Sequence, residues 1–160
     1  MGKIAFLFAG QGSQAPGMGQ ELAQNYKCAD DAFNEASEAL GFDIKDMIFN
    51  GDKETLMITE NTQPTIVTMS VAALRVLEEK GIKPDVVAGL SLGEYTAHVA
   101  SGSLDFKDAV RLVRKRGKYM QEEVPVGIGA MAAILGLNAD EVREAAKKAS
   151  EFGVCSGANF

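Results

Sequence analysis

The sequence predicts an α/β fold in which helices flank a parallel sheet. Two short apolar runs, residues 3–8 and 86–88, are typical of buried strands. Segments with helical periodicity lie between these runs and after them, and such alternation indicates parallel strands joined by helices. The second run passes through Gly89-Leu90-Ser91-Leu92-Gly93 directly into a helical pattern. This strand–turn–helix sequence makes residues 84–95 the segment around which the chain is organised.

Composition and charge restrict the classes of function. The 160 residues suffice for one domain with a hydrophobic core, and their composition, 46% hydrophobic and 24% charged, is that of a globular protein. A net charge of -6 argues against nucleic acid as a partner. No apolar run reaches the roughly 20 residues of a membrane span. Cys28 and Cys155 fit no metal-binding spacing, so we expect free thiols in a reducing cytoplasm, with no membrane and no metal.

The first third of the chain is predicted to be one strand, one loop and several helices. Residues 3–8 are almost continuously apolar, as in a central parallel strand that is covered on both faces. Residues 9–19 form a glycine-rich loop. Apolar periodicity, the helix-ending Gly41 and the turn Asn50-Gly51 predict helices over residues 20–26, 29–40, 43–49 and 52–57.

The middle of the chain is predicted to hold a long helix and the strand–turn–helix segment. Thr62-Gln63-Pro64 opens the long helix, with Pro64 in its first turn, where a missing N–H costs nothing. Gly81 ends that helix. After the strand at 86–88, helices are predicted over residues 94–100 and 106–121.

The sequence changes character near residue 125, which predicts a second, smaller unit. Residues 130–137 and 152–156 are strand-like, and a helix over residues 139–150, capped by Asn138, separates them. We therefore expect one unit at residues 1–124 and another at residues 125–160.

Ser91 is the candidate nucleophile. In Gly-x-Ser-x-Gly after a strand, the serine occupies a strained turn, and the flanking glycines avoid clashes there. Amides at the start of the following helix point toward an oxyanion formed beside the hydroxyl. The alternative is a glycine-rich turn in which Ser91 only caps the helix.

The glycine-rich loop allows two interpretations. Residues 10–15 satisfy the loose Gly-x-Gly-x-x-Gly/Ala pattern of dinucleotide sites. However, Pro16 interrupts the expected helix start, and Asp30 and Asp31 lie in a helix, whereas the ribose-binding acid should end a second strand. The other interpretation is that exposed amides of this loop complete an oxyanion hole for Ser91.

Arg116 is the unusual cation of the helix at 106–121. The other basic residues share a stripe that is expected to be an ordinary solvated face: Lys107, Arg111, Arg114, Lys115 and Lys118. Arg116 instead projects toward the apolar side, where a cation needs an anionic partner. That partner is either an internal carboxylate, Glu94 or Asp105, or the carboxylate of a substrate.

His98 is the only histidine of the chain. It follows Ser91 by seven residues, a rise of about 10 Å along a helix. A general base must lie about 3 Å from the hydroxyl. His98 is therefore a poor candidate, and we expect the base to be missing from this sequence.

Several ordered motifs resemble one family. The five motifs are Phe8–Gln14, Thr62-Gln63-Pro64, Gly89–Tyr95, Arg116–Gln121 and Gly129–Ala133, and the resemblance that they carry extends over the whole chain. Together they resemble the bacterial malonyl-CoA:acyl carrier protein transacylases of type II fatty acid synthesis.

The resemblance implies an acyltransferase reaction. Ser91 would accept a malonyl group from coenzyme A and pass it to the phosphopantetheine thiol of acyl carrier protein. Backbone N–H groups of Gln11 and Leu92 would form the oxyanion hole, Arg116 would bind the malonyl carboxylate, and Gln63 would shape the pocket. No metal is implied, and no cofactor besides the coenzyme A thioester that serves as substrate.

The resemblance also implies an architecture. It predicts an α/β-hydrolase-like core, incomplete at residues 1–124, and part of an inserted ferredoxin-like subdomain at residues 125–160, in a cytoplasmic monomer. The family usually has histidine at the position of Leu90, a departure that we expect to alter packing only. The family's catalytic histidine and a further pocket glutamine lie beyond residue 160. We therefore expect the sequence to be the N-terminal half of a longer enzyme, slow or inactive alone.

Other functions remain open at this point. An α/β-hydrolase-type esterase or thioesterase should carry a His-Gly-Gly-Gly oxyanion loop, which is absent. A non-catalytic fragment would explain the missing base. The basic stripe between Lys107 and Lys118 could attract an acidic carrier protein, although such stripes are usually only solvated.

Overall fold

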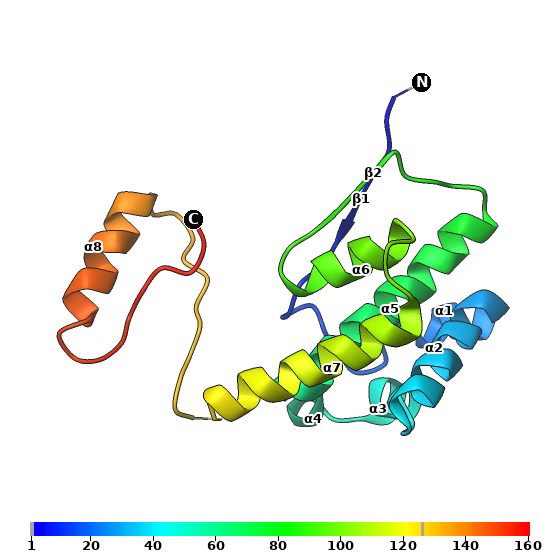
Figure 1. Ribbon diagram of the computed structural model, residues 1–160, viewed down its shortest axis with the longest axis horizontal. Coiled ribbons are helices and arrows are strands. Elements are labelled where there is room, and N and C mark those ends of the chain that lie inside the picture. Colours follow the sequence, from blue (N-terminus) through cyan, green and yellow to red (C-terminus); the bar gives the residue numbers. More distant parts are fainter. Residues whose placement is uncertain (1, 126) are drawn as a thin grey trace. The chain divides into compact units, whose positions relative to one another are not determined.

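The computed structural model describes residues 2–125 and 127–160, and these two stretches form two separate compact units. The predicted α/β class is confirmed, with one small parallel sheet and many helices (Figure 1). The elements of the first unit are β1 Ala5–Phe8, α1 Gln20–Asn25, α2 Lys27–Leu40, α3 Ile44–Asn50, α4 Lys53–Met57, α5 Thr59–Glu79, β2 Val86–Gly89, α6 Leu92–Ala100 and α7 Phe106–Glu123.

The sheet joins the two strands that the sequence predicts. β1 and β2 pair in parallel, from Ala5 opposite Val86 to Phe8 opposite Gly89, and α6 packs against both. Alternate residues differ in exposure, and Leu7 is 80% and Val86 55% exposed. The prediction of a strand covered on both faces is therefore wrong for the described residues, because α6 shields only one side of the sheet.

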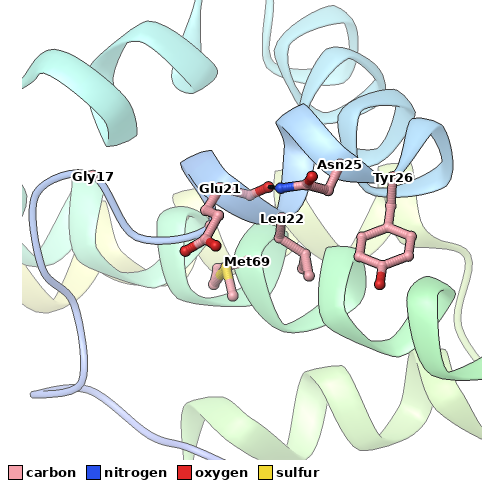
Figure 2. A pocket seen from close by; sticks show the side chains of 7 residues that line it. Gly17, Glu21, Leu22, Asn25, Tyr26 and Met69 are labelled. Carbon is pink, nitrogen blue, oxygen red and sulfur yellow. Dashed lines mark hydrogen bonds between the residues drawn. The ribbon is translucent and has the colours of Figure 1, made fainter.

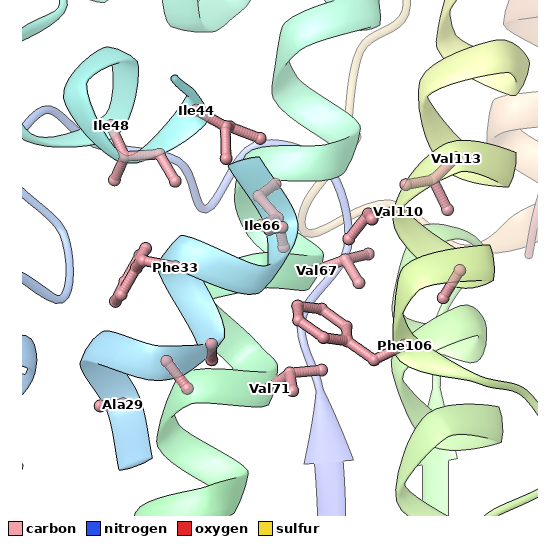
Figure 3. Close-up of a cluster of buried hydrophobic side chains, with 14 of the residues drawn as sticks. Ala29, Phe33, Ile44, Ile48, Ile66, Val67, Val71, Phe106, Val110 and Val113 are labelled. Atoms are coloured by element: carbon pink, nitrogen blue, oxygen red, sulfur yellow. The ribbon is translucent and has the colours of Figure 1, made fainter. Parts of the chain in front are cut away.

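The hydrophobic core is built around α5. This helix packs mainly against α7 and α2, and Figure 3 shows Ile66, Val67 and Val71 of α5 between side chains of those two helices. Residues 61–68 are all buried. α2 contributes the predicted small and aromatic stripe with Phe33 at its centre, and α7 contributes Val110 and its neighbours. Because α5 is enclosed on several sides, its first half carries no solvent-facing stripe.

The start of α5 differs from the prediction. The helix begins at Thr59, so Pro64 lies more than one turn inside it rather than in the first turn. Asn61 and Thr62 already donate backbone hydrogen bonds to the Ile58 carbonyl, at 2.8 Å each. Proline at this depth leaves the carbonyl four residues earlier without its helical donor.

The second unit contains α8, Ala139–Ala149, and the predicted cap is present. The Asn138 side chain accepts hydrogen bonds from Asp140 and Glu141, and the Glu141 side chain accepts one from the Asn138 amide. The strands predicted at residues 130–137 and 152–156 are wrong, because both segments are irregular. A strand needs a neighbour to satisfy its backbone groups, and these two segments do not pair.

No helix within the described residues combines the length and the apolar character that crossing a bilayer requires.

Candidate active site

Ser91 lies in a strained turn between β2 and α6. Its backbone, with φ 52° and ψ -103°, is the only positive-φ conformation of a non-glycine residue among those described. A methyl group at Gly89 would overlap the backbone of Gly93, and one at Gly93 would overlap the carbonyl oxygen of Phe8. Both glycines are thus required by close backbone packing, and the strain is concentrated at the candidate nucleophile.

Two backbone amides lie in the segments next to this turn. Parallel pairing puts the carboxyl ends of β1 and β2 at one edge of the sheet, where a methyl group at Gly10 would lie 3.0 Å from the Leu90 carbonyl oxygen. Gln11 follows in the loop after β1, and its side-chain amide donates to Thr59 Oγ1 at 3.3 Å. Leu92 begins α6, where the first amides have no helical acceptor. Within the described residues neither backbone amide donates a hydrogen bond.

Arg116 reaches Ser91 from α7. Its Nη2 donates to Ser91 Oγ at 3.1 Å, and its Nη1 donates to Gln63 Oε1 at 2.8 Å. The guanidinium also lies 5.8 Å from the ring centroid of Tyr95. Sequence reasoning assigned no role to Tyr95, although the strand–turn–helix segment includes it.

The internal carboxylate partner proposed for Arg116 is not present in the part of the chain that the structure describes. Glu94 forms no ion pair there, and Asp105 instead caps α7 by accepting from the amides of Lys107 and Asp108. Arg116 therefore presents a cation, held by neutral groups, beside the candidate nucleophile.

Gln63 fixes the other side of the guanidinium. Its side chain is fully buried in α5, and its Nε2 donates to Met120 Sδ at 3.2 Å. Met120 follows Arg116 by one helical turn, so the two share a face of α7. The four-residue spacing is visible in the sequence, but no local pattern indicates that Met120 of α7 contacts Gln63 of α5.

His98 does not reach Ser91. It lies in the last turn of α6, where its Nδ1 is 3.0 Å from Ser103 Oγ. The Ser103 hydroxyl is in turn 2.8 Å from Ser101 Oγ. The structure thus places the only histidine of the sequence in a separate exposed hydroxyl cluster.

The expected solvated face of α7 is present at Arg111, Lys115 and Lys118, which are exposed, but Lys107 and Arg114 are half-buried and form tertiary ion pairs. Lys107 pairs with Glu38 at 2.8 Å, and this hydrogen bond lowers the pKa of the Glu38 carboxyl and raises the pKa of Lys107. Arg114 pairs with Glu60 at 2.8 Å, and its side chain is only 28% exposed. Weaker contacts join Arg111 to Asp108 and Lys118 to Glu122, at 3.2 and 3.8 Å. Tertiary ion pairs therefore use part of the charge that the stripe would offer to a partner.

A separate hollow of about 650 Å³ opens beside α1 and α5 (Figure 2). Glu21, Leu22, Tyr26 and Met69 are among its lining residues, and none of the predicted site residues is. The described residues also contain no cluster of three or more His, Cys, Asp or Glu side chains suited to a metal ion. Neither the hollow nor a metal cluster defines the candidate site, which is identified instead by the contacts of Ser91 with its neighbours.

Comparisons with known proteins agree with one another. The sequence profile of the family described as "Acyl transferase domain" matches residues 5–156. The malonyl CoA-acyl carrier protein transacylase of Bacillus subtilis (strain 168) is 53% identical over 153 residues, 96% of this chain and 48% of that protein. The protein of that name from Escherichia coli (strain K12) is 49% identical over 161 residues, 100% of this chain and 52% of its own length.

Solved structures give the same result. The malonyl CoA-acyl carrier protein transacylase of Clostridium perfringens superposes with a TM-score of 0.90 at 46% identity, over 99% of this chain and 50% of that one. A malonyl-transacylase in the PlMCAT:AntF complex with a type II PKS acyl-carrier protein gives 0.89 at 45% identity, over 94% and 49%. The chain spans about half the length of the relatives that it matches.

Proposed function

Because the chain belongs to the acyl transferase domain family, we propose that it supplies the nucleophile and the carboxylate-binding arginine of a malonyltransferase. The reaction moves a malonyl group from coenzyme A to the phosphopantetheine thiol of an acyl carrier protein. Relatives named for this reaction are 45–53% identical to the chain. Since the chain spans about half of their length, the activity proposed is that of the whole protein.

Two successive acyl transfers make up the proposed reaction. Ser91 Oγ attacks the thioester carbonyl carbon, a base takes the hydroxyl proton, the C–S bond breaks, and coenzyme A leaves as its thiol. The carrier thiol then attacks the serine ester, and Ser91 regains its proton as the C–O bond breaks. Atoms and electrons balance without a further reagent, so no cofactor beyond the thioester is required. Both substrates are expected in the cytoplasm.

Each tetrahedral intermediate carries a negative oxygen that needs donors. We assign this role to the backbone N–H groups of Gln11 and Leu92. The touching loops after β1 and β2 support the assignment, as do the free amides and the positive end of the α6 dipole. Because these donors belong to the backbone, side-chain substitutions at either position should leave them in place.

The hydrogen bond from Arg116 to Ser91 is the observation that favours malonyl over an uncharged acyl group. A guanidinium 3.1 Å from the nucleophile lies within reach of the free carboxylate of a malonyl ester on that oxygen. An acetyl ester offers no such partner. The buried Gln63 on α5 accepts a hydrogen bond from Arg116 and so keeps its guanidinium oriented.

The general base and the small unit complete the proposal. His98 is directed elsewhere, so we place the catalytic histidine in the part of the relatives that this chain does not span. We also propose that residues 1–124 form an α/β-hydrolase-like core and that residues 125–160 begin a ferredoxin-like subdomain. Residues 1–160 alone should then turn over slowly or not at all.

Trapping the acyl-enzyme tests the function. The complete natural protein is mixed with malonyl-CoA, quenched in acid, digested and mapped by mass spectrometry. We expect the malonyl mass on the peptide that contains Ser91, and its loss in Ser91→Ala. Malonyl mass on another residue would overturn the mechanism. Release of free malonate in preference to malonyl-carrier would instead favour a thioesterase.

A further inference from the structure

Pro64 leaves a gap in the hydrogen bonding of α5. Proline has no N–H, so the carbonyl of Glu60, four residues earlier, lacks its usual helical donor. This carbonyl lies in the first turn of the helix that carries Gln63. Glu60 is partly buried, and a carbonyl withdrawn from water without a donor is costly, so a donor from elsewhere would stabilise the start of α5.

Arg114 of α7 supplies that partner. Its Nη1 donates to the Glu60 carbonyl oxygen at 3.4 Å and to Asn61 Oδ1 at 2.5 Å, while its Nη2 lies 2.8 Å from Glu60 Oε1. The guanidinium also lies 4.8 Å from the ring centroid of Phe42. One side chain thus holds a backbone oxygen and two side-chain oxygens in the turn that precedes Pro64.

Gly117 lets α7 approach this turn closely. A methyl group there would lie 2.6 Å from the Thr59 carbonyl oxygen and 2.8 Å from Glu60 Cα. α7 therefore packs nearly backbone to backbone against the start of α5, with Arg114 and Arg116 on either side of the contact. Arg114 anchors residues 60 and 61, and Arg116 is bonded to residue 63.

We propose that Arg114 is a positioning residue for the acyl-binding cation. By closing the hydrogen-bond gap before Pro64, it fixes the first turns of α5, and so fixes Gln63 Oε1 at the point where that oxygen orients Arg116. Arg114 itself contacts neither Ser91 nor, by this assignment, the substrate. The inference rests on the proposed malonyltransferase function, because only a carboxylated acyl group depends on the orientation of Arg116.

The ratio of the kcat/KM values for two substrates distinguishes a positioning role of Arg114 from a role in stability alone. In the complete protein, acylation of Ser91 is followed with malonyl-CoA and, at higher enzyme concentration, with acetyl-CoA, which has the same thioester without the carboxylate. Arg114→Lys keeps the charge beside Glu60 but loses the fork. We expect the malonyl-to-acetyl ratio of kcat/KM to fall about tenfold, mainly through a higher KM for malonyl-CoA.

Arg75 provides the matched control. It pairs with Glu35 at 2.6 Å, lies 5.1 Å from the Phe106 ring centroid and is 27% exposed, so it resembles Arg114 in its contacts but lies in the later half of α5. Arg75→Lys should lower the melting temperature and leave the substrate ratio within about twofold.

The outcomes distinguish the two proposals. Suppose that the wild-type protein is acylated at Ser91 and that Arg114→Lys lowers kcat/KM equally for malonyl-CoA and acetyl-CoA. Arg114 is then only structural, and the inference fails. If Arg75→Lys shifts the ratio as much as Arg114→Lys does, the effect is general destabilisation, and the inference fails again. If the wild-type protein is not acylated by malonyl-CoA, the proposed function itself fails. Arg114→Ala serves as a second variant, and Arg114→Lys decides the test if the alanine variant does not fold.

Discussion

Arg116 Nη2 donates a hydrogen bond to Ser91 Oγ at 3.1 Å, which joins the end of β2 to the middle of α7. The two residues are separated by a helix and a loop in sequence, and neither motif alone implies that they touch. Ser91 lies on a strained turn beside an arginine that has no carboxylate partner among the described residues, and this arrangement suits acyl groups that carry their own negative charge.

Removing the guanidinium should separate malonyl from acetyl transfer. Arg116→Ala deletes a charge-assisted fork from the acyl site, so acylation by malonyl-CoA should lose about 2–4 kcal/mol of transition-state stabilisation. Acylation by acetyl-CoA should change far less. Stopped-flow measurement of coenzyme A release in the complete protein gives both rates, with Arg111→Ala, on an exposed face of the same helix, as control. Equal losses for both substrates would contradict the carboxylate-binding role.

The turn between β2 and α6 should tolerate no side chain at Gly93. Gly93→Ala places a methyl group on the Phe8 carbonyl oxygen, where backbone must move, so the free energy of unfolding should fall by about 2–3 kcal/mol. Urea denaturation followed by circular dichroism measures the loss. Gly153→Ala meets no atom within 4 Å and should stay within about 0.5 kcal/mol of wild type. Similar stabilities for the two variants would refute the close packing of α6 on β1.

Acid should weaken the tie between α2 and α3. Lys45 hydrogen-bonds Asp30 at 2.6 Å and lowers the pKa of that carboxyl below its ordinary value of 3.8. Because the folded-state pKa is the lower one, the pair stabilises the fold above pH 3.8, and the stabilisation disappears as the pH falls through the folded-state pKa.

Melting curves of Asp30→Asn test this sign. The two side chains are 35% and 29% exposed, so the variant should melt only about 1–3 °C below wild type at pH 7. As the pH falls through the folded-state pKa of Asp30, the melting curves of the variant and the wild type should converge. Glu151→Gln, whose side chain has no described ion pair, should show no difference at pH 7 or in acid. If the difference in melting temperature between Asp30→Asn and the wild type persists in acid, the stabilisation comes from the hydrogen bond and not from the charge.

Local patterns predicted the parts of the fold that local forces decide. Gly41 ends α2 and Asn138 caps α8, both as predicted, and the Gly-x-Ser-x-Gly pattern placed Ser91 in its turn. The start of α5 could not be predicted in this way. Pro64 is a normal first-turn residue, and it is tolerated deeper in the helix here because Arg114, fifty residues later, bonds the free carbonyl.

The candidate site was predictable in its members but not in their connections. The apolar side of its helix showed that Arg116 faces inward. Whether it pairs with Glu94, with Asp105 or with a substrate carboxylate depends on tertiary packing, which the sequence does not show. The same holds for residues 130–137 and 152–156: their β-propensity is local, but a strand forms only where another strand is available to pair.

A negative charge introduced at Gln63 should prevent Arg116 from binding the malonyl carboxylate while the fold is kept. Gln63→Glu is nearly isosteric and puts a buried carboxylate where an amide oxygen now accepts from Arg116 at 2.8 Å. The new ion pair would occupy the guanidinium, so a malonyl carboxylate would have to compete with an internal anion. We expect kcat/KM for malonyl-CoA to fall at least about tenfold, with acetyl-CoA nearly unaffected and the melting temperature maintained. Gln24→Glu, the same change on an exposed position of α1, controls for net charge. Undiminished malonyl transfer by a folded Gln63→Glu protein would show that Arg116 does not need to be free of anions, and would remove the electrostatic basis of the proposed acyl selectivity.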